Sequence, residues 1–228
     1  MIQLLMFLQA EPVEGEEVVK DSIIDMILKG GPIGVIIVGI LLILSVLALY
    51  IFIERYLTIK KAGQVDSGFF NNIKTAVTSG NIEGAKAMCS SNDSPVSRMI
   101  LKGLMRIGKP LRDIDASIEN VGNLELYKME KNLSTLASIA GAAPMIGFLG
   151  TVTGMIMAFY TMATEQNVTP DALAGGIYQA LITTAFGLAI GIFAFVGYNY
   201  LVALVDKVVF KMEQSSVEFM DLLQEPSK

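Results

Sequence analysis

The stretch NLSTLASIAGAAPMIGFLGTVTGMIMAFYTMAT, residues 132–164, contains no Asp, Glu, Lys or Arg over its full length. A helix needs about 20 mostly apolar residues to cross the hydrocarbon core of a membrane. Two more stretches meet this condition, residues 30–53 and residues 172–205. The sequence therefore predicts an all-α membrane protein with three transmembrane helices. The second and third stretches exceed the required length, so we expect these helices to continue beyond the bilayer.

The composition agrees with a membrane protein. Of the 228 residues, 53% are hydrophobic and only 17% are charged, against about 25% in soluble domains. The mean hydropathy is +0.56. A net charge of -5 argues against nucleic-acid binding. The sequence has no His and a single cysteine, Cys89. This composition excludes zinc sites built from His and Cys, Ser-His-Asp triads and internal disulfides. We therefore expect no catalytic residue, no metal site and no cofactor.

The basic residues are distributed unevenly around the three stretches. Residues 54–131 carry 12 of the 17 Lys and Arg residues, the tail 206–228 carries three, and the loop 165–171 carries none. Segments rich in Lys and Arg stay in the cytoplasm. We therefore expect residues 54–131 to form a cytoplasmic helical domain and residues 206–228 to extend the third span as a cytoplasmic C-terminal helix. The N-terminal segment 1–29 and the loop 165–171 would then be periplasmic.

Helix-start signals recur within the segment expected in the cytoplasm. Asn81 can cap one helix, Ser94 with the proline after it can cap a second, and a third can begin after Pro110. From Leu111 onward no proline interrupts the pattern until Pro144. This pattern predicts a single helix that runs from Leu111 into the second span.

Small residues recur along one face of the second and third stretches. Such stripes let membrane helices approach each other closely, so we expect them to pack these two helices together. The first stretch, in contrast, is almost wholly Ile, Leu, Val and Gly, which fits a lipid-facing helix. The small residues are Gly147, Gly150, Thr151, Gly154 and Ala158 in the second stretch, and Gly176, Ala180, Thr184, Gly187 and Gly191 in the third.

The candidate pore-lining residues are Thr151, Thr184, Thr183 and Gln179. Spacing alone leaves two readings open: these side chains face a cavity or a partner helix, or the Thr hydroxyls only donate to carbonyls of their own helix. No residue in the three stretches is ionisable near neutral pH. Thr and Gln cannot take up and release a proton as a carboxylate does, so a proton path would need a titrating group from another chain. Coordination of sodium by the Thr hydroxyls is an open alternative.

Two motifs carry a family resemblance. AAPMIGFLGTVTGM, residues 142–155, resembles the second-span signature of the MotA/TolQ/ExbB proton channel family, and GIYQALITTAFGL, residues 176–188, resembles the third-span signature. The pair Tyr198-Asn199 resembles the family's Tyr-Asn that follows. With the matching topology, the resemblance covers nearly the whole chain and is closest to the ExbB members.

The resemblance implies a homo-pentamer in a bacterial inner membrane, built around a dimer of single-span ExbD-like partners. A membrane Asp of the partner would be the titrating group, and Thr151 and Thr184 would match the family's two pore threonines. The complex would use the proton motive force to do work on a TonB-like protein. Gln179 stands where ExbB members commonly have Glu, and Phe193 stands where they have Pro. A TolQ-like or motility stator, and a membrane scaffold that conducts no ions, remain alternatives.

Overall fold

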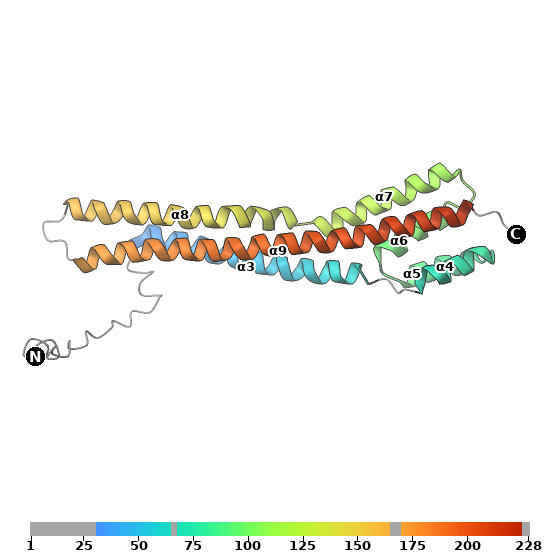
Figure 1. Cartoon of the computed structure of the whole chain (residues 1–228), viewed down its shortest axis with the longest axis horizontal. Coiled ribbons are helices and arrows are strands. Elements are labelled where there is room, and N and C mark those ends of the chain that lie inside the picture. The colour runs from blue at the N-terminus through green and yellow to red at the C-terminus, as the bar shows by residue number, and fades with distance from the viewer. Residues whose placement is uncertain (1–30, 65–67, 165–169, 225–228) are drawn as a thin grey trace, which may run out of the picture. The chain divides into compact units, whose positions relative to one another are not determined.

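The computed structural model describes residues 31–64, 68–164 and 170–224, and all secondary structure in these residues is helical. The segment 1–29, most of the loop 165–171 and the last four residues lie outside the described residues. The helices are α3 (Gly31–Ala62), α4 (Phe69–Thr78), α5 (Ile82–Ser91), α6 (Pro95–Leu104), α7 (Leu111–Glu130), α8 (Leu133–Thr164) and α9 (Pro170–Gln224), shown in Figure 1.

Three helical regions are long and apolar enough to cross a membrane. They are Ile33–Ala62 in α3, Leu111–Thr164, which includes α7 and α8, and Ala174–Gln224 in α9. The predicted fold class, an all-α membrane protein with three spanning helices, is confirmed. α9 runs without interruption to Gln224, so residues 206–224 continue the third span as one helix, as predicted.

The prediction of one helix from Leu111 into the second span is wrong, because α7 and α8 are separate helices. Lys131 has an extended conformation with φ -51° and ψ 133°, and Asn132 has a left-handed φ of 64°. Asn enters the left-handed region more readily than most residues. The Asn132 carbonyl then accepts the N–H of Leu136 at 3.2 Å, as α8 begins. No proline was needed for this break.

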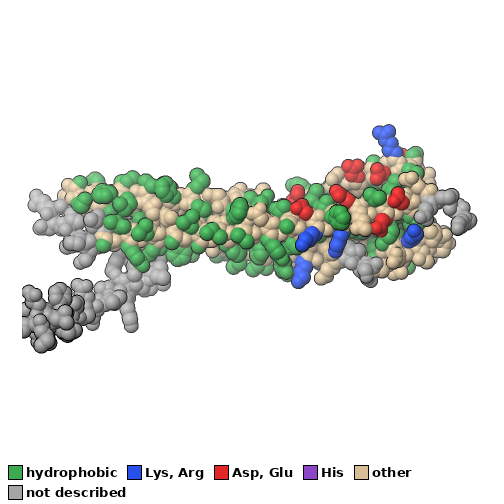
Figure 2. All heavy atoms as spheres, in the orientation of Figure 1, with side chains coloured by type: hydrophobic (Ala, Val, Ile, Leu, Met, Phe, Trp, Pro, Cys, Tyr) green, Lys and Arg blue, Asp and Glu red, His purple; other side chains and the backbone are tan. Residues whose placement is uncertain are grey.

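The described residues form two compact units. Unit 1 contains residues 31–41 of α3 and, from α8 and α9, residues 146–164 and 170–187. Unit 2 contains the described residues within 42–145 and 188–224, including α4 to α7. Figure 2 shows acidic and basic side chains on the surface of unit 2.

The predicted helix caps of unit 2 are confirmed at α5 and α6. The Asn81 side chain accepts the N–H of Gly84 at 2.9 Å, and the Ser94 hydroxyl accepts the N–H of Ser97 at 3.1 Å. Each bond satisfies a backbone donor that the first turn of a helix leaves without a partner. These caps fix where the two short helices begin.

The core of unit 2 joins α6, α7 and α9. Phe219 of α9 and Ile118 of α7 are fully buried. A Cβ at Gly103 of α6 would lie 2.6 Å from the Phe219 ring and 2.8 Å from Ile118. α6 therefore needs a glycine at this position for the C-terminal part of α9 to pack against it.

The surface of the spanning helices is strongly apolar. Among large hydrophobic side chains, Ile43 of α3 is 69% exposed, Phe148 of α8 is 64% exposed and Leu181 of α9 is 61% exposed. A chain that stayed in water would rarely expose so many large apolar groups together. These faces suit lipid or the helices of other chains.

Candidate functional site

In unit 1 the small residues bring the backbones of α8 and α9 together. A Cβ at Gly147 would lie 2.8 Å from the Thr183 carbonyl oxygen and 3.0 Å from the Gly187 Cα. A Cβ at Gly154 would lie 2.9 Å from the Ala180 Cβ. Larger side chains would force the helices apart, so the small residues permit this close crossing.

Two threonines of α9 form hydrogen bonds at the crossing. The Thr184 hydroxyl donates to the Gly147 carbonyl of α8 at 2.9 Å. The Thr183 hydroxyl donates to the Ala180 carbonyl of its own helix at 2.7 Å and lies 3.4 Å from the Gly147 carbonyl. Thr183 is 1% exposed, and a Cβ at Gly150 would lie 2.3 Å from its hydroxyl. Thr183 and Thr184 therefore lie between the two helices.

Thr151 has different surroundings from Thr183 and Thr184. Its hydroxyl donates to the Phe148 carbonyl of its own helix at 2.6 Å. Thr151 lines a shallow, open hollow on the surface of α8, where its neighbours are Val152, Met155, Ile156, Phe159 and Tyr160. Because the hydroxyl proton is directed to a backbone carbonyl, Thr151 can present only an acceptor oxygen to this mostly apolar hollow.

Gln179 lies inside unit 1, between α9 and α3. It is 4% exposed, and a Cβ at Gly34 of α3 would lie only 2.0 Å from its Nε2. Gln179, Thr153 and Thr183 also line a small cavity of about 20 Å³, which is large enough for one water molecule. Gly34 was not predicted as a site residue, although it is a glycine among large residues of the first span. The four candidate pore-lining residues therefore do not line one common surface. They are Thr151, Thr183, Thr184 and Gln179.

In unit 2, α9 packs against α8 through Gly191 and against α3 through Phe193. A Cβ at Gly191 would lie 2.4 Å from the Pro144 ring of α8 and 3.1 Å from the Ala140 carbonyl. Pro144 lacks the N–H that would bond to Ala140, and its ring needs the space that Gly191 leaves. Phe193 packs edge-on against Phe52 of α3 with ring centroids 5.7 Å apart. A proline at position 193 would lose this contact.

Comparison with known proteins identifies the family. Residues 91–214, which include α8 and most of α9, match the model of the MotA/TolQ/ExbB proton channel family. The chain belongs to this family. Its members are channel subunits rather than a class of enzymes.

Three curated relatives illustrate the range of the family. A putative biopolymer transport protein ExbB homolog of Methanothermobacter thermautotrophicus is 30% identical over 194 residues, 84% of this chain and 67% of the relative. The Tol-Pal system protein TolQ of Pseudomonas aeruginosa is 32% identical over 142 residues, 58% of this chain and 62% of the relative. The biopolymer transport protein ExbB of Xanthomonas campestris is 28% identical over 115 residues. The chain spans only 46% of this third relative.

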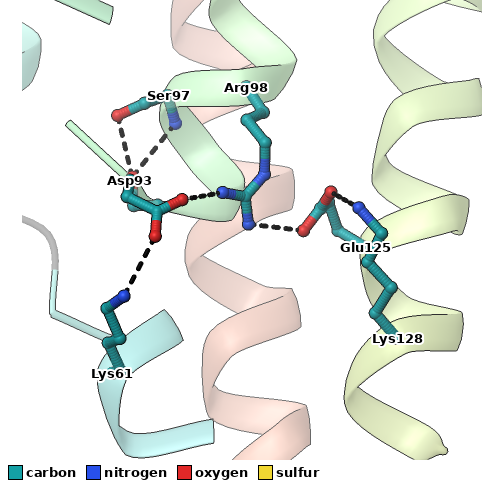
Figure 3. A network of polar contacts seen from close by, with 7 residues as sticks. Lys61, Asp93, Ser97, Arg98, Glu125 and Lys128 are labelled. Atoms are coloured by element: carbon teal, nitrogen blue, oxygen red, sulfur yellow. Dashed lines mark hydrogen bonds and ion pairs between the residues drawn. The ribbon is translucent and has the colours of Figure 1, made fainter. Parts of the chain in front are cut away.

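This MotA/TolQ/ExbB member also contains a charged network that the sequence analysis did not predict (Figure 3). Arg98 of α6 donates to Asp93 and, at 2.6 Å, to Glu125 of α7. Lys128 donates to Glu125 at 2.7 Å, and Lys61 at the end of α3 donates to Asp93 at 3.0 Å. The network joins α3, α6 and α7 within unit 2.

The surroundings of Glu125 keep it charged. Burial alone would raise the pKa of the Glu125 carboxyl, whose side chain is 5% exposed. Hydrogen bonds from Arg98 and Lys128 and their positive charges outweigh burial and hold this pKa below its ordinary value. The hydrogen bond from Lys61 likewise lowers the pKa of Asp93. At neutral pH the network therefore consists of ion pairs that bind the helices of unit 2 together.

Proposed function

We propose that this chain is an ExbB-like stator subunit of a proton channel in a bacterial inner membrane, with the N-terminus in the periplasm and the C-terminus in the cytoplasm. In this proposal it forms a pentamer around two single-span, ExbD-like partners. The complex converts the proton motive force into work on a TonB-like protein.

The observation that carries this proposal is the direction of the Thr hydroxyls. In the described spans, Thr151, Thr153, Thr183 and Thr184 each donate their proton to a backbone carbonyl. Each of these hydroxyls can therefore accept a hydrogen bond but has no proton left to donate. A protonated carboxyl group is a suitable donor, so Thr151 would stabilise the neutral form of a carboxylate from another chain.

The cost of charge in a membrane determines where a partner carboxylate would be protonated. A carboxylate in an apolar site tends to take up a proton, because burial disfavours the charged form. The hollow at Thr151 is mostly apolar and open, so a helix of another chain could lie against it. A partner Asp would be protonated there and would pass in its neutral form from one subunit of the pentamer to the next. It would release the proton where water reaches it.

Proton flux into liposomes that contain the chain and its partner tests the role of Thr151. Thr151→Ala removes the acceptor, so we expect flux to fall by about 3- to 10-fold, as the loss of one hydrogen bond predicts. The matched control is Thr161→Ala, because Thr161 lies on the same helix, donates to its own Met157 carbonyl at 3.1 Å and does not line the hollow. Equal flux in both variants, with the oligomer intact, would defeat the assignment of Thr151.

One observation favours a second candidate function, a membrane scaffold that conducts no ions. Gln179 cannot titrate, and it lies buried against Gly34. A scaffold would show no flux of any cation in the same liposomes. A sodium-coupled channel would show flux only when sodium replaces the proton gradient. The partner's identity would separate a TonB system from a TolQ-like or motility system.

A further inference from the structure

A groove of about 350 Å³ lies between α7 and α9 in unit 2, with α6 at its base. Its floor is apolar, because Met99 and Met212 are 5% and 3% exposed there. Gly122 of α7 borders the floor, and a Cβ at Gly122 would lie 3.2 Å from the Met99 Cε. Val217 at the rim is 60% exposed. Flexible Met side chains adapt to the shape of an apolar partner, so this floor suits apolar side chains from another molecule.

The rim of the groove is acidic. Asp115 and Glu119 lie one turn apart on α7, Glu213 lies on α9, and all three are exposed. None of the described residues that line the groove is a Lys or Arg. Carboxylates around an apolar floor complement a helix that carries Lys or Arg beside an apolar stripe. The same charges repel nucleic acid and anionic lipid.

The position of the groove along α9 restricts what can reach it. The third charge-free stretch ends at Val205, while Val209 and Val217 line the groove four and twelve residues further on. At the rise of an α-helix, the groove covers roughly 6 to 18 Å beyond the end of that stretch. A segment next to the membrane span of another protein would reach this depth. On the cytoplasmic side such segments are rich in Lys and Arg.

We propose that this groove docks the basic amphipathic segment next to the span of the single-span partner. The identity of that partner rests on the proposed function, whereas the chemistry of the groove does not. Docking would hold the partner's cytoplasmic end on unit 2 while the partner's membrane carboxylate takes up and releases protons beside the spanning helices. The groove is thus a second contact with the partner, separate from the hollow at Thr151.

Binding of a short fluorescent peptide with Lys and Leu at helical spacing tests this proposal. The full chain in a neutral detergent is titrated, and fluorescence anisotropy gives the Kd. We expect the double variant Glu119→Lys/Glu213→Lys to weaken binding at least about tenfold, because it replaces two attractions with two repulsions. The control Asp113→Lys/Asp221→Lys makes the same charge change on the same two helices, outside the groove, and should change the Kd less than about twofold.

Each other outcome overturns the proposal. Equal weakening by both variants would mean that the peptide senses only net charge. No binding to the unsubstituted chain would mean that the groove takes no basic helix. If the groove variant alone changed the oligomeric state in analytical ultracentrifugation, the occupant would be a second copy of this chain. The assay needs no proton flux, so a failed flux experiment leaves this result standing, and the reverse also holds.

Discussion

The close approach of α8 and α9 at Gly147 can be tested by the addition of one methyl group. In Gly147→Ala the new Cβ would lie 2.8 Å from the Thr183 carbonyl oxygen, 3.0 Å from the Gly187 Cα and 3.2 Å from the Thr184 Cα. All three are backbone atoms, so no rotation of a side chain can make room. To restore an ordinary contact of 3.4 Å, the helices must separate by about 0.6 Å.

The expected destabilisation follows from three terms. Overpacking costs about 1–3 kcal/mol. Separation also weakens the hydrogen bond from Thr184 to the Gly147 carbonyl, which contributes about 0.5–1.5 kcal/mol. The higher helix propensity of Ala offsets up to about 1 kcal/mol. We therefore expect Gly147→Ala to lower the free energy of unfolding by about 0.5–4.5 kcal/mol.

Gly141 on the same helix provides the control, because a Cβ there would meet nothing within 4 Å. Gly141→Ala should be neutral or stabilising by up to about 1 kcal/mol. The assay is the fraction of detergent-solubilised protein that keeps its size on gel filtration after heating. A loss of about 2 kcal/mol should lower the midpoint by roughly 4–8 °C. Equal midpoints for the two variants would refute a close backbone crossing at Gly147.

Three further predictions concern α3 and the charged network. Gly34→Ala, whose Cβ would lie 2.0 Å from the Gln179 Nε2, forces the end of the buried Gln179 side chain to rotate and should cost about 0.5–1.5 kcal/mol, whereas Gly39→Ala meets nothing within 4 Å and should not. If heating inactivates both equally, α3 does not pack on Gln179. Folding lowers the pKa of Glu125 below its ordinary value of 4.5, so the charged carboxyl stabilises the fold at pH values above about 4.5. This contribution is lost as the pH falls through the lowered pKa. Acid unfolding followed by circular dichroism should therefore show a flatter pH dependence below about pH 4.5 in Glu125→Gln than in the unsubstituted chain. A steeper one would contradict the ion pairs. Arg98→Gln, which removes one donor from a buried carboxylate, should cost about 1–3 kcal/mol at neutral pH.

The sequence was sufficient for the spans and for several local features. Stretches without charge and longer than about 20 residues have few alternatives to a membrane helix. The Asn81 and Ser94 caps are local, since each joins a side chain to a backbone N–H three residues later. The break at Asn132 was not predictable in this way, because Asn is tolerated within a helix and no proline or glycine marks the position.

The arrangement of the candidate site depended on contacts between distant residues. Periodicity placed Thr151 and Thr184 on small-residue faces, but only the packing shows that Thr184 bonds to the Gly147 carbonyl and that Thr151 lines an open hollow. Gln179 packs on Gly34 of a different helix, and Arg98 meets Glu125 across 27 positions of sequence. A helical period gives the face of a residue but not the neighbour that this face meets.

The location of the proton carrier can be tested by measuring the proton conductance of the purified chain, with and without the single-span partner that we propose. The spans contain hydroxyl and amide groups but no carboxylate. The chain by itself in liposomes should therefore pass no saturable proton current, and addition of the partner should produce one. A robust saturable current through the chain without any partner would show instead that the proton carrier lies within this chain, and the proposed role of the partner's carboxylate would be wrong.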